Sequence, residues 1–444
     1  MLSVLANRTY RHLFFAQVIA LVGTGLATVA LGLLAYEIAG ADAGAVLGTA
    51  LAIKMVAYVG IAPIAGAYSD RLPRKGLLIA MDVVRGVVAL MLPFVDAIWQ
   101  IYLLIFVLQS ASAVFTPTFQ ATIPDILPDE EDYTQALSMS RLAYDLESLL
   151  SPMLAAAMLA IINFHWLFAG TSVGFIASAL LVTTTVLPHR EAVAQKVEGV
   201  WRKTTRGMRI YLKTPRLVGL LAVTLAAAAG SAMVIVNTVV IVKEMGRTQG
   251  EVALALAAYG GGSMLAALAL PRLLRQVNDR SVMILGAGLL AVTLAALGLI
   301  APRIGNEALW SVLLAGWLAM GIAYSVCVTP GGRLLKRSAG EADRPALFAA
   351  QFALSHVCWL IAYPVAGQIG ALVGMPAAFL LLAAFAGLGF ALALWLWPRS
   401  DPGSLVHSHP DLPADHPHLR EYGFGRHAHD FVIDDLHTTW PGKV

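Results

Sequence analysis

The stretch that separates the second and third apolar runs of this chain reads Gly66-Ala67-Tyr68-Ser69-Asp70-Arg71-Leu72-Pro73-Arg74-Lys75. Gly66 permits close approach of helices, and Pro73 ends the spanning region. The basic residues gather at one membrane edge, where anionic lipid favours Arg and Lys. The stretch therefore predicts a short charged loop between two membrane-spanning helices, although Arg74 and Lys75 alone would fit any positively charged loop.

The composition of the whole chain also indicates a membrane protein. Of its 444 residues, 58% are hydrophobic, about 258 residues, and only 13% are charged. Soluble domains carry roughly 25% charged residues, so a soluble chain of this length would need about twice as many. At about 20 residues per spanning helix, the apolar residues supply roughly twelve spans. We therefore expect an all-α membrane protein that is not an enzyme.

Twelve apolar runs fall into two sets of six. They lie at about residues 13–38, 44–68, 76–95, 97–115, 135–162 and 165–187, and then at about 217–242, 252–272, 282–301, 308–329, 346–371 and 376–397. This pattern predicts two six-helix pseudo-repeats, 1–188 and 217–398. The interval 189–216 between them carries eight Lys and Arg residues among scattered apolar ones. It predicts a basic amphipathic helix on the cytoplasmic membrane surface.

The basic residues are distributed unevenly between the two ends of these runs. With twelve crossings, 24 of the 30 Lys and Arg residues lie on the side of both termini, and only Lys243, Arg247 and Arg303 lie on the opposite side. Cytoplasmic loops carry the excess of Lys and Arg. We therefore expect a multi-pass protein of the plasma (inner) membrane with both termini in the cytoplasm. No small-residue cleavage site follows the first run, so we expect no cleavable signal peptide.

The charged loop resembles a signature of the major facilitator superfamily, Gly-x-Leu-Ala-Asp-Arg-x-Gly-Arg-Lys. The positions that match are Gly66, Asp70, Arg71, Arg74 and Lys75, whereas Tyr68, Ser69 and Pro73 depart from the commonest residues. The resemblance implies a twelve-helix transporter that works by alternating access. It also implies that Asp70 and Arg71 form a cytoplasmic latch that favours the outward-facing state.

Other segments are similar to the drug:H⁺ antiporter branch, which holds macrolide-type and siderophore exporters. They are residues 7–11 with Ala16 and Gln17, and residues 115–128 after the fourth run. Ser151 and Pro152 resemble the start of an exporter signature, Gly-Pro-x-x-Gly-Gly. Small residues beside a proline let helices approach and flex, but ordinary helix packing accounts for them as well.

Two departures from the family pattern bear on mechanism. Gln109 matches an Arg-x-x-Gln-Gly pattern of the fourth run, but Phe106 stands in place of its Arg, so the proton-linked role of that Arg is not carried over. The second half keeps only a degenerate form of the charged loop, in residues 271–275 and 278–280, as diverged halves do.

All the ionisable residues within the runs belong to the first half. They are Lys54, Asp82, Arg85, Arg141, Asp145 and Glu147, with Glu37 near the outer end of the first run. A charge in the bilayer costs at least about 2.5 to 3.5 kcal/mol, which makes each a functional candidate. Asp82 with Arg85, and Arg141 with Asp145, share helix faces and could simply neutralise each other.

Glu147 is left without a local partner, because it faces away from Asp145 two residues earlier. A carboxyl group without a partner in low dielectric can load and release a proton near neutral pH. Lys54 could pair with Glu147 instead, which would make both structural. We expect Glu147 or Asp82 to carry the coupling proton.

The second half offers polar and soft groups rather than charges. Its polar residues within the runs are Asn237, Gln351, His356 and Gln368. Substrate sites of secondary transporters lie near the midplane between the halves. There, Cys327, His356 and Cys358 are candidate soft ligands for a metal cation, and Asn237 is a candidate lining residue. His356 and Cys358 do not share a helix face, and hydrogen-bonded packing is the alternative role for His356.

The composition changes abruptly at Arg399, so residues 399–444 predict a soluble, largely disordered tail. The tail holds seven of the eleven histidines: His407, His409, His416, His418, His427, His429 and His437. Imidazole is a good ligand for divalent transition metals, and three His-x-His pairs on a flexible chain can close around one Ni²⁺, Co²⁺ or Zn²⁺ ion. The tail resembles that of nickel-resistance exporters in the same superfamily. A compositionally biased tail with no metal role is the alternative.

These observations predict a secondary active exporter, driven by inward proton flow in antiport. The first choice of substrate is a divalent transition metal, Ni²⁺ or Co²⁺. A multidrug, macrolide or siderophore exporter is the alternative, which an apolar and aromatic central cavity would favour. A membrane-anchored metal sensor is a third interpretation, and the latch motif argues against it. We expect a monomer whose partners are lipid, protons and substrate. A net charge of +3 gives no reason to expect nucleic acid.

Overall fold

The structure is a computed structural model. It describes residues 2–68, 73–187, 200–340, 343–399, 404–409, 413, 417–423 and 425–440. Some side chains inside described helices are also left out, among them those of residues 62–68 and 201–204.

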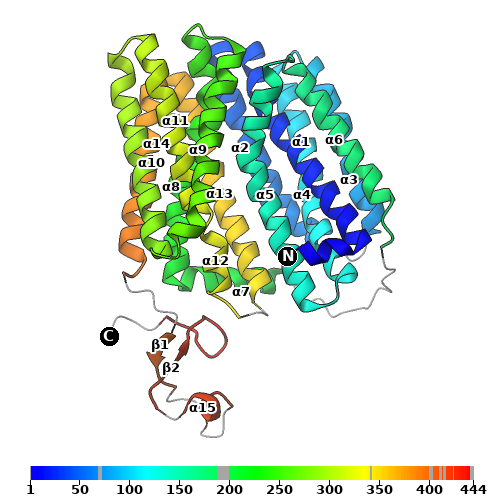
Figure 1. Cartoon of the computed structure of the whole chain (residues 1–444), viewed down its shortest axis with the longest axis vertical. Coiled ribbons are helices and arrows are strands. Elements are labelled where there is room, and N and C mark those ends of the chain that lie inside the picture. Colours follow the sequence, from blue (N-terminus) through cyan, green and yellow to red (C-terminus); the bar gives the residue numbers. More distant parts are fainter. Residues whose placement is uncertain are drawn as a thin grey trace.

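Twelve helices of 18 residues or more run through the described part of the chain and form one bundle (Figure 1). They are α1 (Arg8–Ala39), α2 (Ala43–Tyr68), α3 (Arg74–Met91), α4 (Ile98–Ile126), α5 (Glu130–Leu159), α6 (His165–Thr183), α8 (Pro215–Glu244), α9 (Gln249–Leu273), α10 (Asp279–Ile300), α11 (Asn306–Val328), α13 (Arg344–Leu372) and α14 (Met375–Leu396). The shorter elements are α7 (Val200–Lys213), α12 (Gly331–Lys336), β1 (Ser404–His407), α15 (Pro417–Tyr422) and β2 (His427–Asp430). Short 3₁₀ turns lie at Leu2–Ala6, Gly40–Asp42, Leu92–Phe94 and Ala301–Arg303.

The bundle has the composition of a membrane domain. Among the described residues, ten stretches are long and apolar enough to cross a bilayer; the first covers α1 and most of α2, and α5 is not among them. Large apolar side chains remain more than half exposed on the outward faces of several helices, for example Leu180, Leu265, Leu268, Val292 and Trp395. Contiguous apolar surface of this kind is typical of lipid contact.

The same helix neighbours recur in both halves. In the first half, α1 packs on α5 and α6, α2 on α4, and α3 on α4 and α6. The corresponding helices of the second half repeat every one of these contacts: α8 packs on α13 and α14, α9 on α11, and α10 on α11 and α14. Across the interface, α2 packs on α13 and α5 on α9, which is also a symmetric pair of contacts. The predicted pair of six-helix repeats is thereby confirmed.

Local sequence sets several helix ends. The Asn7 side chain accepts a hydrogen bond of 3.1 Å from the Tyr10 amide at the start of α1. Thr248 and Glu251 form a reciprocal capping box at the start of α9, and Pro215 is the first residue of α8. The caps bond main-chain N–H groups that have no partner inside the helix, and Pro215 has no N–H group that would need one.

Two helices are longer than hydropathy predicted. The fourth apolar run ends at about residue 115, but α4 continues to Ile126, and α5 begins at Glu130 rather than at about 135. In the added part of α4, the Thr118 and Thr122 hydroxyls donate to main-chain oxygens four residues earlier. Hydropathy marks only the apolar part of such a helix, because internal hydrogen bonds let it continue past the apolar segment.

The two halves approach most closely at the end of the bundle away from the N terminus. A Cβ added at Gly367 of α13 would lie 2.0 Å from the main-chain oxygen of Gly44 in α2. One turn further, a Cβ at Gly48 would lie 2.5 Å from the main-chain oxygen of Tyr363. The glycines allow main-chain contact between the helices, which side chains would prevent. This end of the interface is therefore closed in the structure.

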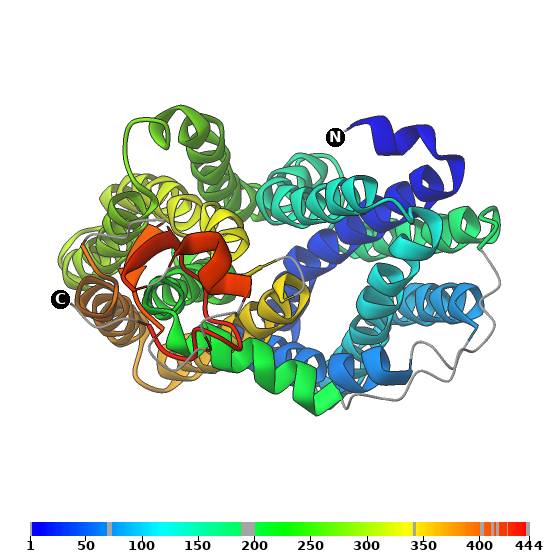
Figure 2. The ribbon, with the colours of Figure 1, turned by 90° about the horizontal axis from the view of Figure 1, so that it is seen from below.

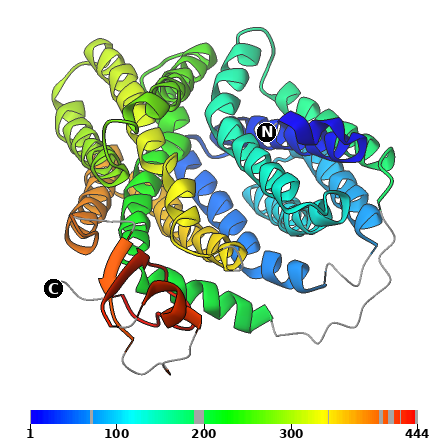
Figure 3. The same ribbon diagram turned by 60° about the horizontal axis from the view of Figure 1, so that its bottom comes forward.

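The tail lies below the second half, on the same side of the bundle as the N terminus (Figure 2). Its described residues include an antiparallel pair of strands, β1 and β2, and the short helix α15. Phe431 and Ile433, which follow β2, are buried against the bundle core. The expectation of a largely disordered tail is wrong for these residues, because their apolar side chains find a surface on the bundle. Helix α7 runs beside the tail across the lower end of the bundle (Figure 3).

Candidate transport site

The charged centre of the first half is formed by Glu147 on α5 and Lys54 on α2. Their side chains lie close enough to interact electrostatically. The Ser151 hydroxyl, one turn along α5, is 3.5 Å from Oε1 of Glu147. Helix α1 passes directly beside them, since a Cβ added at Gly25 would lie 2.7 Å from Glu147 Oε1 and 2.0 Å from Ser151 Oγ. Gly25 thus leaves the space that the carboxylate occupies.

One tyrosine of the second half lies near this carboxylate, and two more lie beside that tyrosine. Tyr363 on α13 is within electrostatic reach of both Glu147 and Tyr324 on α11. The Tyr324 ring centroid lies 5.9 Å from that of Tyr259 on α9. Phenol rings combine apolar faces with a hydroxyl that can donate or accept a hydrogen bond. An acid and a base from one half therefore meet an aromatic, hydrogen-bonding surface from the other.

A small cavity extends from Lys54 into the first half, between α1, α2 and α4. Its polar lining includes Lys54, Gln109 and the threonines Thr24 and Thr28. With about 10 Å³ of free volume, it has room for about one water molecule. The Gln109 amide oxygen is buried without a hydrogen-bond partner among the described residues. A water molecule here would satisfy that oxygen and extend the polar path from Lys54.

A second aromatic contact bridges the halves one turn further along α2. The Tyr58 ring stacks on His356 of α13, with centroids 5.5 Å apart, and lies 5.9 Å from Phe352. Nδ1 of His356 is 2.6 Å from the main-chain oxygen of Phe352, which can only accept, so Nδ1 carries the proton. His356 is therefore a hydrogen-bonded packing residue in this structure.

Each half also holds an ion pair at the end where the N terminus lies. In the first half, Arg74 at the start of α3 pairs with Asp125 near the end of α4. In the second half, Asp279 at the start of α10 pairs with Arg333 in α12, which follows α11. Because these helices correspond in the two repeats, the same ion pair occurs in both halves, with the positions of the acid and the base exchanged.

This duplicated architecture matches one family over most of the chain. The sequence profile of the Major Facilitator Superfamily matches residues 13–246 and again residues 219–415. The chain belongs to the Major Facilitator Superfamily. It is therefore a multi-pass membrane transporter and not an enzyme, as the sequence predicted.

Relatives within the superfamily are distant. An uncharacterised MFS-type transporter of Bacillus subtilis (strain 168), YfiS, is 25% identical over 164 residues, 36% of this chain and 38% of its own length. Macrolide efflux protein A of Streptococcus pyogenes is 23% identical over 188 residues, 40% of this chain and 46% of its own length. The chain thus spans less than half the length of these curated relatives. A bacterial homologue of the human lysosomal transporter Spinster, solved in an inward-facing and occupied conformation, has a similar fold, with a TM-score of 0.67 at 11% identity over 87% of this chain and 96% of that one.

The soft groups of this superfamily member are not gathered at its centre. The Cys327 thiol lies against α10, 3.7 Å from the Met283 oxygen, and both cysteines are buried. Asn237 donates to the main-chain oxygen of Ala366 over 2.9 Å and holds α8 against α13. The candidate metal ligands and lining residues thus have separate partners. Their predicted role in substrate binding stays a prediction.

Asp82 and Arg85 form a buried ion pair inside the first half. The Ser178 hydroxyl donates to Asp82 over 2.7 Å. The Arg85 guanidinium lies between the rings of Phe115 and Phe175, at 4.2 and 4.5 Å from their centroids. Each charge is partnered away from the interface between the halves, so this pair has the contacts of a neutralising pair and Glu147 is the better candidate for coupling.

Some candidates lie outside the described residues, and others lie at the edges of the bundle. Asp70 and Arg71 belong to residues 69–72, which the structure does not describe, so the latch itself is untested. The main chain is described, but no side-chain environment, for Gly66, Arg141, Asp145 and Pro152. Lys75 donates to the Thr183 and Thr185 oxygens at the end of α6, over 2.7 Å each. Glu37 lies near the surface, 3.8 Å from His165.

The inverted ion pairs make a prediction for this transporter. Asp125→Arg alone places two guanidinium groups together. A like-charge contact costs up to several kcal/mol, so we expect initial efflux to fall about tenfold or more. Adding Arg74→Asp recreates the polarity of the second half and should restore most of the activity, measured as efflux from proteoliposomes. A double variant as defective as the single one would contradict a role for the pair.

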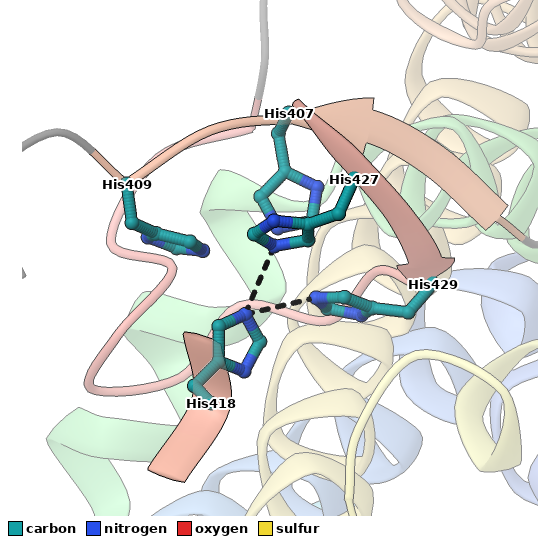
Figure 4. A group of neighbouring side chains, drawn as sticks. All are labelled: His407, His409, His418, His427 and His429. Carbon is teal, nitrogen blue, oxygen red and sulfur yellow. Dashed lines mark hydrogen bonds between the residues drawn. The ribbon is translucent and has the colours of Figure 1, made fainter. Parts of the chain in front are cut away.

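The tail brings together five of the seven predicted metal-ligating histidines. One ring nitrogen from each of His407, His409, His418, His427 and His429 lies within 4.8 Å of the others (Figure 4). Burial and the neighbouring rings lower the pKa of His418 to about 4. The pKa values of His407 and His409 are lowered for the same reasons. The rings of these three histidines are therefore neutral near pH 7. His416 lies outside the described residues.

Sequence reasoning missed the residues that complete the central site. Gly25 and the three tyrosines were not singled out, because a glycine or a tyrosine in an apolar run has no distinctive pattern of its own. In the sequence, only the charge of Glu147 indicated this site. A carboxylate inside the bundle needs space, so its charge could have prompted a search for a small residue on a facing helix. The tyrosines lie more than 100 residues away in sequence, so only the fold brings them there.

Proposed function

We propose that this transporter exports an amphiphilic organic compound of the macrolide type in exchange for protons. The observation that carries the proposal is the opposition of Glu147 and Lys54 in one half to Tyr363, Tyr324 and Tyr259 in the other. Such a surface suits a bulky molecule with rings and a polar or cationic group. The similarity to macrolide efflux protein A supports the same substrate class.

In the proposed cycle, a proton and the substrate compete for the carboxylate of Glu147. A deprotonated Glu147 pairs with Lys54 and can exchange this partner for the cationic group of a substrate from the cytoplasm. Protonation from outside removes that charge and weakens substrate binding. Proton and substrate each shift the balance between inward- and outward-facing states only through their different affinities for them. Because protons flow inward down their gradient, this exchange drives the substrate outward.

The sequence favoured a metal ion as the substrate. We now propose an organic compound first and a metal ion second. Cys327 and His356 each have a hydrogen-bond partner, and Cys358 is buried, which supports packing roles for them. The observation that favours a metal is the histidine cluster, which lies in the tail rather than in the bundle.

The test uses purified protein in liposomes with an imposed pH gradient. We expect a labelled macrolide to move against its concentration gradient, and the pH gradient to be consumed as it does. Ni²⁺ is assayed in parallel with a metal-sensitive dye inside the vesicles. Transport of Ni²⁺ without transport of the macrolide would overturn the proposed substrate class in favour of the metal, and a macrolide that does not move at all would also contradict it.

A further inference from the structure

The histidines of the tail are arranged by strand geometry. In the antiparallel pair, His407 of β1 lies opposite His427 of β2, and His429 lies opposite Leu405. Side chains two residues apart point to the same face of a strand. His427 and His429 therefore project together, and His407 joins them from the neighbouring strand. His418 reaches the same place from α15, and His409 from the segment after β1 (Figure 4).

The spacing of the ring nitrogens suits a single small cation. Nε2 of His418 is 3.2 Å from Nε2 of His427 and 3.3 Å from Nε2 of His429. Metal–imidazole bonds of about 2.0–2.1 Å at tetrahedral angles place two nitrogens about 3.3–3.4 Å apart. His418 is thus spaced from each of the other two like one ligand of a first-row transition ion from the next, and the ligand atoms of all five histidines lie within 4.8 Å of one another.

Two rings of the cluster present their Nε2 atoms to each other. Nδ1 of His407 is 3.0 Å from the Leu405 oxygen, and Nδ1 of His437 is 2.9 Å from a carboxylate oxygen of Asp434. Both partners can only accept, so each Nδ1 atom donates. The two Nε2 atoms lie 3.1 Å apart, close enough to be ligands of one ion.

Two further ring nitrogens in the cluster, Nε2 of His409 and Nδ1 of His427, are buried and have no hydrogen-bond partner in the part of the tail that the structure describes. Buried polar atoms are nearly always partnered, so each such atom needs an explanation. Metal coordination supplies one for His409, whose free nitrogen lies among the others. For His437, the contact with Asp434 is the carboxylate–histidine arrangement that orients metal ligands in proteins.

We propose that the tail forms a binding site for one divalent first-row transition ion, with His407, His418, His427 and His429 as ligands and His409 or His437 completing the set. An all-imidazole set suits Zn²⁺, Ni²⁺, Co²⁺ and Cu²⁺ rather than Mg²⁺ or Ca²⁺. The site is separate from the transport site, and it does not depend on the proposed substrate.

The site is anchored to the bundle directly after β2. Arg216 at the start of α8 donates to the Phe431 oxygen over 3.3 Å, and its guanidinium lies 5.0 Å from the Trp440 ring centroid. Arg206 on α7 bonds Asp435 of the tail over 2.8 Å and Asp343, just before α13, over 2.5 Å. Metal binding should therefore order a segment that is tied to both α7 and α13.

The test measures metal binding to the purified full-length protein, independently of transport. After incubation with Zn²⁺, Ni²⁺ or Co²⁺ and dialysis, we expect about one ion per chain by elemental analysis. The visible absorption of bound Co²⁺ should report nitrogen ligands. The variant His418→Ala/His429→Ala should lose the ion, whereas His12→Ala/His165→Ala, in the membrane bundle, should keep it. Hydrogen exchange of residues 404–440 should slow when the metal is added to the native protein only.

Two results would overturn the site. One is a native protein that retains no ion after dialysis. The other is a His418→Ala/His429→Ala variant that binds as much metal as the native protein, which would place the binding elsewhere. If that variant lost both metal and tail structure, the Co²⁺ spectrum of the native protein would still decide the matter, since a spectrum without nitrogen ligands contradicts the proposal. Failure here leaves macrolide transport unaffected, so the two proposals are separately testable.

Discussion

Glu147→Gln is expected to abolish pH-driven efflux while leaving substrate exchange intact. The amide has nearly the shape of the carboxyl group, so it fits the space beside Gly25 and Ser151, but it cannot carry a proton. Net antiport needs a proton to bind and leave in each cycle, whereas exchange of labelled for unlabelled substrate across the membrane needs neither. We expect at least a 100-fold loss in the first assay, equivalent to about 2.7 kcal/mol, and less than about a threefold change in the second.

Two other carboxylates in the first half provide controls for this prediction. Glu37 lies near the C-terminal end of α1 and is more than half exposed, so Glu37→Gln should leave both assays unchanged. Asp82→Asn removes the partner of the buried Arg85, and breaking a buried ion pair costs about 3–5 kcal/mol. We expect it to lower thermal stability and both kinds of transport together. If Asp82→Asn instead uncoupled transport from the pH gradient while Glu147→Gln did not, the coupling group would be Asp82.

The fold could be predicted largely because the bilayer imposes a strong pattern on the sequence. Apolar runs gave the number of long helices, and basic residues gave their expected orientation. Hydropathy could not give the true ends of α4 and α5, since a helix continues wherever its own hydrogen bonds are satisfied. It also could not show which helices meet, and the partner of Arg74 proved to be Asp125, 51 residues later.

The tail shows how one composition permits two interpretations. Few apolar residues and many histidines, prolines and aspartates are typical of disorder. The spacing of the histidines carried the other signal, because His-x-His repeats with the period of a β-strand and puts both rings on one face. Phe431 and Ile433 then supply the apolar contact that holds the strands to the bundle. Periodicity was therefore more informative here than composition.

Gly367→Val is expected to block the closing of the bundle at the end away from the N terminus and to slow transport by at least tenfold. The added Cβ would lie 2.0 Å from the main-chain oxygen of Gly44 and 3.0 Å from the Cα of Ala45. A main chain within two helices cannot swing aside as a side chain can. Overpacking costs about 1–3 kcal/mol and occasionally more, and each 1.4 kcal/mol is a factor of ten in the population of the closed state.

The balance between the open and closed states of this end can be measured at Thr49. Its hydroxyl accepts a hydrogen bond of 3.4 Å from Gln368 across the interface. We expect Thr49→Cys to react slowly with a membrane-impermeant maleimide added outside, and much faster when Gly367→Val is also present. The native Cys327 and Cys358 are buried and contribute little background. Gly261→Val on α9 is the matched control, because a Cβ there meets no atom within 4 Å. Normal folding with unchanged transport and unchanged labelling in Gly367→Val would show that the glycine contact between α2 and α13 does not govern closure at this end of the bundle.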